Sequence, residues 1–143
     1  LMMDTIARHG VTTMHFVPSM LHLFLEDPGL LRGDARLESL RHVFASGEAL
    51  TADQVRRFRE RIGVPFNARL VNLYGPTEAT VDVSYYDCSD GDNSINDISI
   101  NVPIGKPIDN ISLYIGSESM KLQPVGIAGE LCISGAGLAR GYI

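Results

Sequence analysis

Residues 70–78 read Leu-Val-Asn-Leu-Tyr-Gly-Pro-Thr-Glu, an apolar run that leads into a turn with several polar side chains. The first part of this stretch, residues 70–73, predicts a buried strand. The glycine and proline at 75–76 predict a tight turn directly after that strand. The stretch therefore predicts a strand of a sheet that ends in a sharp, chemically functional loop.

The loop after this strand combines an aromatic ring, a hydroxyl and a carboxylate. The ring of Tyr74 can stack on a planar base, and Thr77 can hydrogen-bond a phosphate oxygen. Glu78 can hold Mg²⁺, which proteins typically bind through one or two carboxylates together with phosphate oxygens. The alternative is a tight turn with a helix cap at Thr77, and the spacing of these residues alone leaves both interpretations open.

The chain before this loop alternates between helical and extended patterns. The expected elements are a helix over residues 2–9, a strand over 11–16, a helix from Pro18 to 27–29, a strand over 41–44, a helix from Thr51 to Gly63 and the strand over 70–73. Thr51 and Gln54 predict a capping box at the start of the last helix. This alternation predicts an α/β fold with a mostly parallel sheet flanked by helices.

Polar or small residues occur at the ends of three of the predicted strands. They are His15, the Ser46-Gly47-Glu48 turn and residues 72–78. Ligands of such sheets bind beyond the carboxyl ends of the strands. The sequence therefore predicts that three loops meet at one edge of the sheet.

A second, smaller lobe is expected after the α/β part. Residues 88–101 are polar and predict a surface loop. Short strands punctuated by Gly and Pro follow, over 111–115 and 130–133, and they predict an antiparallel lobe. We divide the chain into part of an α/β core subdomain, residues 1–101, and the start of a β-rich subdomain, residues 102–143, and we expect both to be parts of one longer domain.

The composition excludes several classes of protein. The chain has 143 residues, is 45% hydrophobic and carries a formal net charge of -5, which argues against a nucleic-acid surface. No apolar run is long enough to span a membrane, and no signal peptide is visible. The two cysteines, Cys88 and Cys132, form neither a disulfide framework nor a metal-spaced pair. We therefore expect a cytoplasmic protein that binds neither nucleic acid nor membrane.

Residues 72–78 resemble the signature of the adenylate-forming enzymes, and Gly-Pro-Thr-Glu within them resembles the amino-acid adenylation domains of nonribosomal peptide synthetases. The run GELCISGAGLARGY at 129–142 is similar to another core motif of that family, and VPIGKP at 102–107 is also typical of it. The three matches occur in the family's order and at family-like spacing. The resemblance covers essentially the whole chain.

The resemblance implies ATP and Mg²⁺ as cofactors and assigns roles to individual residues. The residues implied to bind the nucleotide are Gly47, Glu48, Ala49, Asn72, Tyr74, Gly75 and Thr77. Asn72 and Tyr74 would contact adenine, and residues 47–49 would line its site largely through backbone. Thr77 and Glu78 are the implied catalytic residues, with Thr77 facing the α-phosphate and Glu78 holding Mg²⁺. We interpret the glycine-rich run at 129–142 as structural.

The resemblance also implies a pocket for the amino-acid side chain. Its matching residues are His15, Phe44, Ser46, Leu73, Val81 and Asp82, a set similar to the pocket of serine-activating domains. His15 and Asp82 offer polar partners for a substrate hydroxyl. A site built to hydrogen-bond a hydroxyl can reject an analogue without it by as much as about 10⁴–10⁵-fold, whereas an extra methyl changes binding by only roughly 1–3 kcal/mol. Threonine is therefore the competitor of serine.

The function implied is activation of an amino acid as aminoacyl-AMP and its transfer to the phosphopantetheine thiol of a carrier protein, with carrier and condensation domains as partners. We expect this chain alone to be inactive, because the family's phosphate loop and catalytic lysine would lie outside it. Two rival functions remain: another acyl- or aryl-activating ligase, or a non-catalytic nucleotide-binding relative. A Ser46-His15-Asp82 hydrolytic triad is disfavoured, because no Gly-x-Ser-x-Gly elbow surrounds Ser46.

Overall fold

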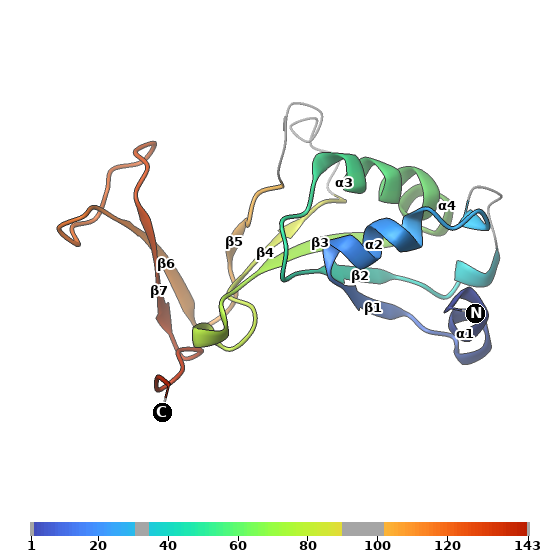
Figure 1. Ribbon diagram of the computed structural model, residues 1–143, viewed down its shortest axis with the longest axis horizontal. Coiled ribbons are helices and arrows are strands. Elements are labelled where there is room, and N and C mark those ends of the chain that lie inside the picture. The colour runs from blue at the N-terminus through green and yellow to red at the C-terminus, as the bar shows by residue number, and fades with distance from the viewer. Residues whose placement is uncertain (1, 31–34, 90–101, 143) are drawn as a thin grey trace.

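The structure is a computed structural model that describes residues 2–30, 35–89 and 102–142. Its elements are α1 (Met2–His9), β1 (Thr13–Phe16), α2 (Pro18–Leu25), η2 (Ala35–Leu37), β2 (His42–Ala45), α3 (Ala52–Phe58), η3 (Arg59–Gly63), α4 (Val64–Phe66), β3 (Arg69–Tyr74), η4 (Thr77–Ala79), β4 (Ser84–Asp87), β5 (Lys106–Pro107), β6 (Ile111–Gly116) and β7 (Glu130–Gly135). Figure 1 shows α2 and α3 along one side of the main sheet and the β6–β7 hairpin projecting from its end.

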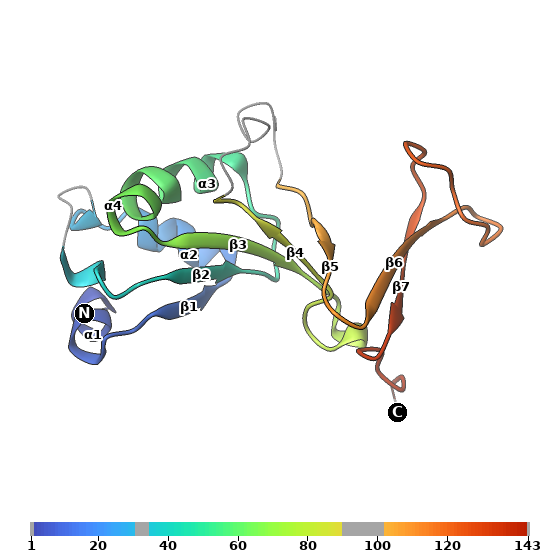
Figure 2. The same ribbon diagram turned by 180° about the vertical axis from the view of Figure 1, so that it is seen from behind.

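The main sheet has five strands in the order β1-β2-β3-β4-β5. Strands β1, β2 and β3 are parallel, whereas β4 and β5 join in antiparallel orientation. The α/β fold with a mostly parallel sheet is thus confirmed, and its antiparallel edge is an addition to what the sequence predicted. Phe16, Ala45 and Asn72 are aligned across the carboxyl ends of the three parallel strands, so the loops that follow begin at one edge of the sheet (Figure 2).

Successive side chains of each strand point to opposite faces of the sheet, and one face is covered by helices more than the other. The covered face contributes Phe16, Val43, Ala45 and Leu70 to the main core, where they meet buried side chains of the helices, among them Leu21, Leu25, Val55, Phe58 and Ile62. Fully burying one such side chain stabilises the fold by roughly 1.5–3 kcal/mol relative to leaving it exposed. On the opposite face His15 is exposed, and its register partner Phe44 is only half-buried.

The helix that begins after Thr51 starts as predicted and ends later than predicted. The Thr51 hydroxyl accepts from the Gln54 backbone N–H, and the Gln54 side chain accepts from the Thr51 N–H, which completes the capping box. Gly63 does not end the helix, because its backbone is helical and the five-residue segment η3 is π-helical. The chain leaves the helix at Asn67, whose φ of 52° is left-handed, a conformation that asparagine tolerates better than most residues.

The β6–β7 hairpin forms the separate antiparallel sheet that the sequence predicted. Its buried Ile111 packs with Ala79 and Val83 in a small second core. The boundary predicted at residue 102 stays a prediction. Val102 belongs to the main core, and β5 pairs with β4, so the change from the large to the small sheet occurs between Pro107 and Ile111.

The prediction of a surface loop over residues 88–101 is wrong for its first residue, Cys88. Cys88 is 4% exposed, and its backbone N–H donates to the Leu70 carbonyl at 2.9 Å, so it extends the pairing of β4 with β3. The rest of that loop from residue 90 onward lies outside the described residues. Within the described ranges, no helix is both long enough and apolar enough to cross a bilayer.

Candidate functional site

A cavity of about 450 Å³ lies at the carboxyl end of β2 and β3. Its lining residues are Gly47, Glu48, Ala49, Leu50, Asn72, Leu73, Tyr74, Gly75, Val102 and Ile104. The residues predicted to bind the nucleotide thus line one cavity, with the exception of Thr77. Segments distant in sequence supply its walls, and the ring of Tyr74, which is partly exposed, offers a planar ligand a surface to stack on.

Asn72 is 4% exposed at this cavity, and its amide is fixed by one hydrogen bond. The Nδ2 donates to the Pro103 carbonyl at 2.9 Å. Because a carbonyl can only accept, this bond decides which end of the amide is the NH₂ group. The Oδ1 is then the acceptor end of this amide.

The Glu48 carboxylate has a structural role, because it forms hydrogen bonds with the start of α2. Its two oxygens accept from the Ser19 backbone N–H at 2.9 Å and from the Ser19 hydroxyl at 3.1 Å. Ser19 lies in the first turn of α2, where the N-cap Val17 has no side chain that can accept a hydrogen bond. Glu48 therefore caps α2 across space, and both of its carboxylate oxygens are already engaged by Ser19.

Gly75 is required because the chain folds back onto it. A Cβ at this position would lie 2.3 Å from the Val81 carbonyl oxygen and 2.6 Å from the Asp82 Cα. The returning chain also donates from the Val83 N–H to the Tyr74 carbonyl at 2.7 Å. The glycine of the motif is thus explained by close backbone approach within the loop itself.

The end of this loop has a strained backbone. Thr80 and Val81 both have positive φ, 58° and 74°, and a β-branched residue rarely adopts that conformation. The Val81 side chain is nevertheless 65% exposed. Strain of this kind persists where the surrounding structure imposes it, and it occurs often at ligand sites.

The six residues predicted for the amino-acid pocket lie at the same edge of the sheet. His15, Phe44 and Leu73 lie on strands β1, β2 and β3, and Ser46 follows β2 directly. The His15 Nε2 and the Ser46 Oγ are hydrogen-bonded at 2.7 Å, with the donor set by the histidine tautomer. Val81 and Asp82 come from the loop after η4, so the pocket residues derive from three parallel strands and the returning chain.

Asp82 carries an unused buried acceptor. Its Oδ1 is buried and has no hydrogen-bond partner among the described residues. Burial raises the pKa of this carboxyl, and the charge of nearby His15 partly opposes that rise. Buried polar atoms in proteins are nearly always hydrogen-bonded, so an orphan acceptor needs an explanation such as a missing ligand.

Glu78 and Thr77 lie on η4, just beyond the cavity, and both are exposed. The Tyr142 hydroxyl donates to Glu78 Oε1 at 3.3 Å, and the negative charge of Glu78 raises the pKa of that phenol. No cluster of three or more His, Cys, Asp or Glu that could hold a metal occurs in residues 2–30, 35–89 and 102–142. One carboxylate still fits Mg²⁺, because this ion keeps several waters and takes other oxygens from substrate phosphates.

A family model described as AMP-binding enzyme matches residues 1–143. The chain belongs to the AMP-binding enzyme family. It is 55% identical over 148 residues to a mycosubtilin synthase protein of Bacillus subtilis, covering 100% of this chain and 5% of that protein. It is also 50% identical over 132 residues to tyrocidine synthase 3 of Brevibacillus parabrevis, covering 92% of this chain and 2% of that protein. The chain thus spans a small part of the length of these curated relatives.

Solved structures with the same fold agree with membership of the AMP-binding family. The amide bond synthetase Mcba from Marinactinospora thermotolerans has a TM-score of 0.81 and 26% identity, covering 99% of this chain and 27% of that one. PA1221, an NRPS protein containing adenylation and PCP domains, also has a TM-score of 0.81, with 28% identity over 98% of this chain and 26% of that chain. The fold described here is therefore a part of a larger adenylate-forming fold.

Three lining residues of the 450 Å³ cavity, Leu50, Val102 and Ile104, were missed by reasoning from the sequence. The Val102 N–H donates to the Leu50 carbonyl at 3.0 Å. Val102 and Ile104 belong to the VPIGKP motif, which was used only as a sign of the family. The signal was present in the sequence, but it gave no indication that this segment forms a wall of the cavity.

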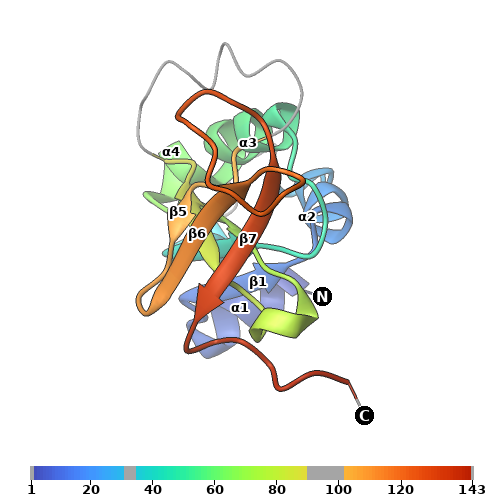
Figure 3. The same cartoon turned by 90° about the vertical axis from the view of Figure 1, so that its left-hand side faces the viewer.

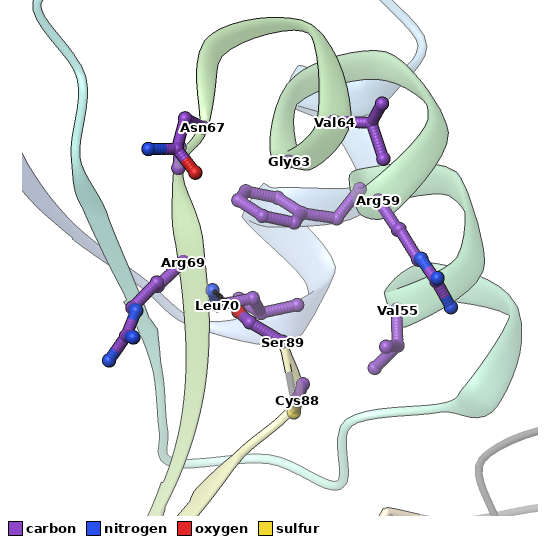
Figure 4. A pocket seen from close by; sticks show the side chains of 11 residues that line it. Val55, Arg59, Gly63, Val64, Asn67, Arg69, Leu70, Cys88 and Ser89 are labelled. Carbon is purple, nitrogen blue, oxygen red and sulfur yellow. Dashed lines mark hydrogen bonds between the residues drawn. The ribbon is translucent and has the colours of Figure 1, made fainter. Parts of the chain in front are cut away.

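A second cavity, of about 320 Å³, lies at the opposite end of the sheet between α3, α4 and the start of β3 (Figure 4). It contains none of the predicted site residues. Burial raises the pKa of its Cys88 thiol to about 12, which keeps that thiol protonated and unreactive at neutral pH. Ser89 in its wall is the last residue described before residue 102, and we assign this cavity no role.

Proposed function

We propose that this chain is part of an adenylation domain that activates an amino acid with ATP for nonribosomal peptide synthesis. The observation that supports this most is the cavity of about 450 Å³, in which the turn at 47–49, the end of β3 and the segment at 102–104 meet. The resemblance predicted adenine contacts from the first two of these segments. Similarity to an NRPS protein containing adenylation and PCP domains supports the same function.

The proposed reaction is an in-line displacement at the α-phosphorus of ATP. A carboxylate oxygen of the amino acid attacks that phosphorus, and the bond to the bridging oxygen of pyrophosphate breaks. Tyr74 and the Asn72 Oδ1 would hold the adenine, and the Thr77 hydroxyl would donate to an α-phosphate oxygen. Mg²⁺, held by Glu78, would offset the charge that develops on the phosphate oxygens.

The aminoacyl group is then proposed to pass to a carrier protein. The phosphopantetheine thiolate of the carrier attacks the activated carbonyl, a thioester forms, and AMP leaves. The proposed partners are thus the carrier and condensation domains of the same synthetase. We assign no covalent nucleophile to the chain itself in either half-reaction.

Serine is the proposed amino acid. The Asp82 Oδ1, buried and unpartnered among the described residues, supplies the acceptor that a substrate hydroxyl would satisfy. The His15–Ser46 pair adds a second polar group at the same edge of the sheet. Phe44 and Leu73 supply the apolar part of the pocket, which favours a small side chain.

The function is tested by amino-acid-dependent exchange of pyrophosphate into ATP, with the intact adenylation domain that contains this chain. We expect serine to give the highest rate in a panel of amino acids, with threonine next. Higher exchange with an aryl or fatty acid than with any amino acid would instead support the acyl- or aryl-ligase alternative. ATP binding by calorimetry without any exchange would support a non-catalytic relative.

Replacement of Asp82 with alanine is expected to lower kcat/KM for serine by roughly 10–100-fold, because a hydrogen bond to a charged group contributes roughly 1.5–3 kcal/mol. The kcat/KM for alanine, which has no hydroxyl, should change little. Asp109→Ala, in an exposed loop, is the matched control. An equal loss for serine and alanine would contradict recognition of the hydroxyl by Asp82.

A further inference from the structure

Residues 136–142, here called the clamp segment, lie against the loop that carries Glu78. The Ala139 N–H donates to the Glu78 carbonyl at 2.7 Å, and the Thr80 hydroxyl donates to the Gly137 carbonyl at 2.6 Å. These two contacts join segments that are distant in sequence. Figure 3 shows the chain leaving β7 and passing beneath the loop of η4.

The clamp segment approaches the loop closely. A Cβ on Gly137 would lie 3.2 Å from the Ala79 carbonyl oxygen and 3.1 Å from the Ile111 Cδ1, so both neighbours would have to shift. Ala79 is 2% exposed and packs in the small core with Ile111. The η4 loop is therefore held between β6 on one side and the clamp segment on the other.

The last contact of the clamp segment reaches the carboxylate itself. The Tyr142 hydroxyl donates to Glu78 Oε1 at 3.3 Å, although the tyrosine side chain is otherwise largely exposed. This bond engages Oε1 of the carboxylate and does not involve Oε2. Carboxylates that bind metals are typically held in this way by a neighbouring donor, and loss of the donor costs roughly 10–100-fold in metal affinity or activity.

We propose that Tyr142 is a positioning residue that orients the Glu78 carboxylate for the divalent cation of MgATP. The inference rests on the proposed function, because it takes Glu78 as the residue that holds Mg²⁺. It changes the interpretation of the GELCISGAGLARGY run, whose final tyrosine then serves the nucleotide site as well as the fold. Tyr142 contacts neither substrate nor cation, and it acts through Glu78.

The test compares Tyr142→Phe, Glu78→Gln and the double variant in the intact adenylation domain. Binding of Mn²⁺ is measured by electron paramagnetic resonance with an ATP analogue that has a methylene group between the α- and β-phosphorus atoms. We expect Tyr142→Phe to weaken Mn²⁺ binding by about tenfold, the lower end of the range for such donors. The KM for the amino acid should stay unchanged, and the substitution should have no further effect in the Glu78→Gln background.

Tyr114→Phe is the matched control, since Tyr114 is an exposed tyrosine of β6 that loses the same hydroxyl. Thermal unfolding confirms that each variant is folded. Unchanged Mn²⁺ binding in Tyr142→Phe, with weaker binding in Glu78→Gln, overturns the role of Tyr142 alone. Unchanged binding in Glu78→Gln overturns the metal role of Glu78, and the inference falls with it. An equal loss in Tyr142→Phe and Tyr114→Phe also overturns it.

Discussion

Replacement of Gly75 with alanine is expected to lower kcat/KM for the proposed activation of an amino acid by more than about 10²-fold and to destabilise the fold by roughly 1–3 kcal/mol. The added Cβ would lie 2.3 Å from the Val81 carbonyl oxygen, which is backbone and cannot rotate away. The loop must therefore move by about 1 Å, and a misplacement of that size can cost about 10²-fold in rate. Overpacking typically costs roughly 1–3 kcal/mol.

The measurements are pyrophosphate exchange and thermal unfolding of the intact domain. Gly63→Ala is the control, because Gly63 has a helical φ of -57° and an added Cβ would lie no closer than 3.4 Å to any neighbour, the Ala68 carbonyl oxygen. That variant should keep both its exchange rate and its stability. Near-normal exchange by Gly75→Ala would mean that the loop can relax, and would remove the link between its geometry and the reaction.

Replacement of Glu78 with glutamine is expected to lower the rate of pyrophosphate exchange by about 10²–10³-fold at moderate Mg²⁺, the size of effect seen when one group that stabilises developing charge is removed. Glutamine keeps the size of the side chain and an acceptor for Tyr142, but it loses the negative charge that attracts a cation. High Mg²⁺ should restore part of the rate.

The dependence of the exchange rate on Mg²⁺ concentration is the measurement for Glu78. Glu118→Gln, at an exposed glutamate of the β6–β7 hairpin, is the control for the change in net charge. If both variants show the same Mg²⁺ dependence as the unchanged protein, Glu78 does not hold the cation. A rate loss that excess Mg²⁺ does not reduce would point to a role in the shape of the loop instead.

Much of the fold could be predicted because local signals agreed with it. The three parallel strands carry apolar residues that alternate with less buried ones, and the capping box at Thr51 marks a helix start. Strand β5 could not be predicted, because it has two residues and both are exposed, so it has no hydrophobic periodicity. Gly63 misled the prediction because glycine also tolerates a helical backbone, and here Asn67 provides the left-handed stop.

The candidate site could be predicted less completely, because its members are joined by contacts between distant residues. The motif identified the residues around Tyr74, and the cavity brings most of them together. The wall formed by Val102 and Ile104 precedes β5, whose pairing with β4 no local pattern reveals. The contact of Tyr142 with Glu78 likewise joins segments that follow different sheets.

The hydrogen bond from Asn72 to Pro103 affects how this protein can be divided for expression. Residues that precede the 90–101 segment and residues that follow it both line the cavity. The hydrogen bond from the Asn72 Nδ2 to the Pro103 carbonyl, 2.9 Å long, joins these two parts of the chain. Two pieces cut between residues 89 and 102 would each carry only part of the cavity lining. An exchange of segments between members of the AMP-binding family would therefore have to keep residues 72 and 103 on the same piece.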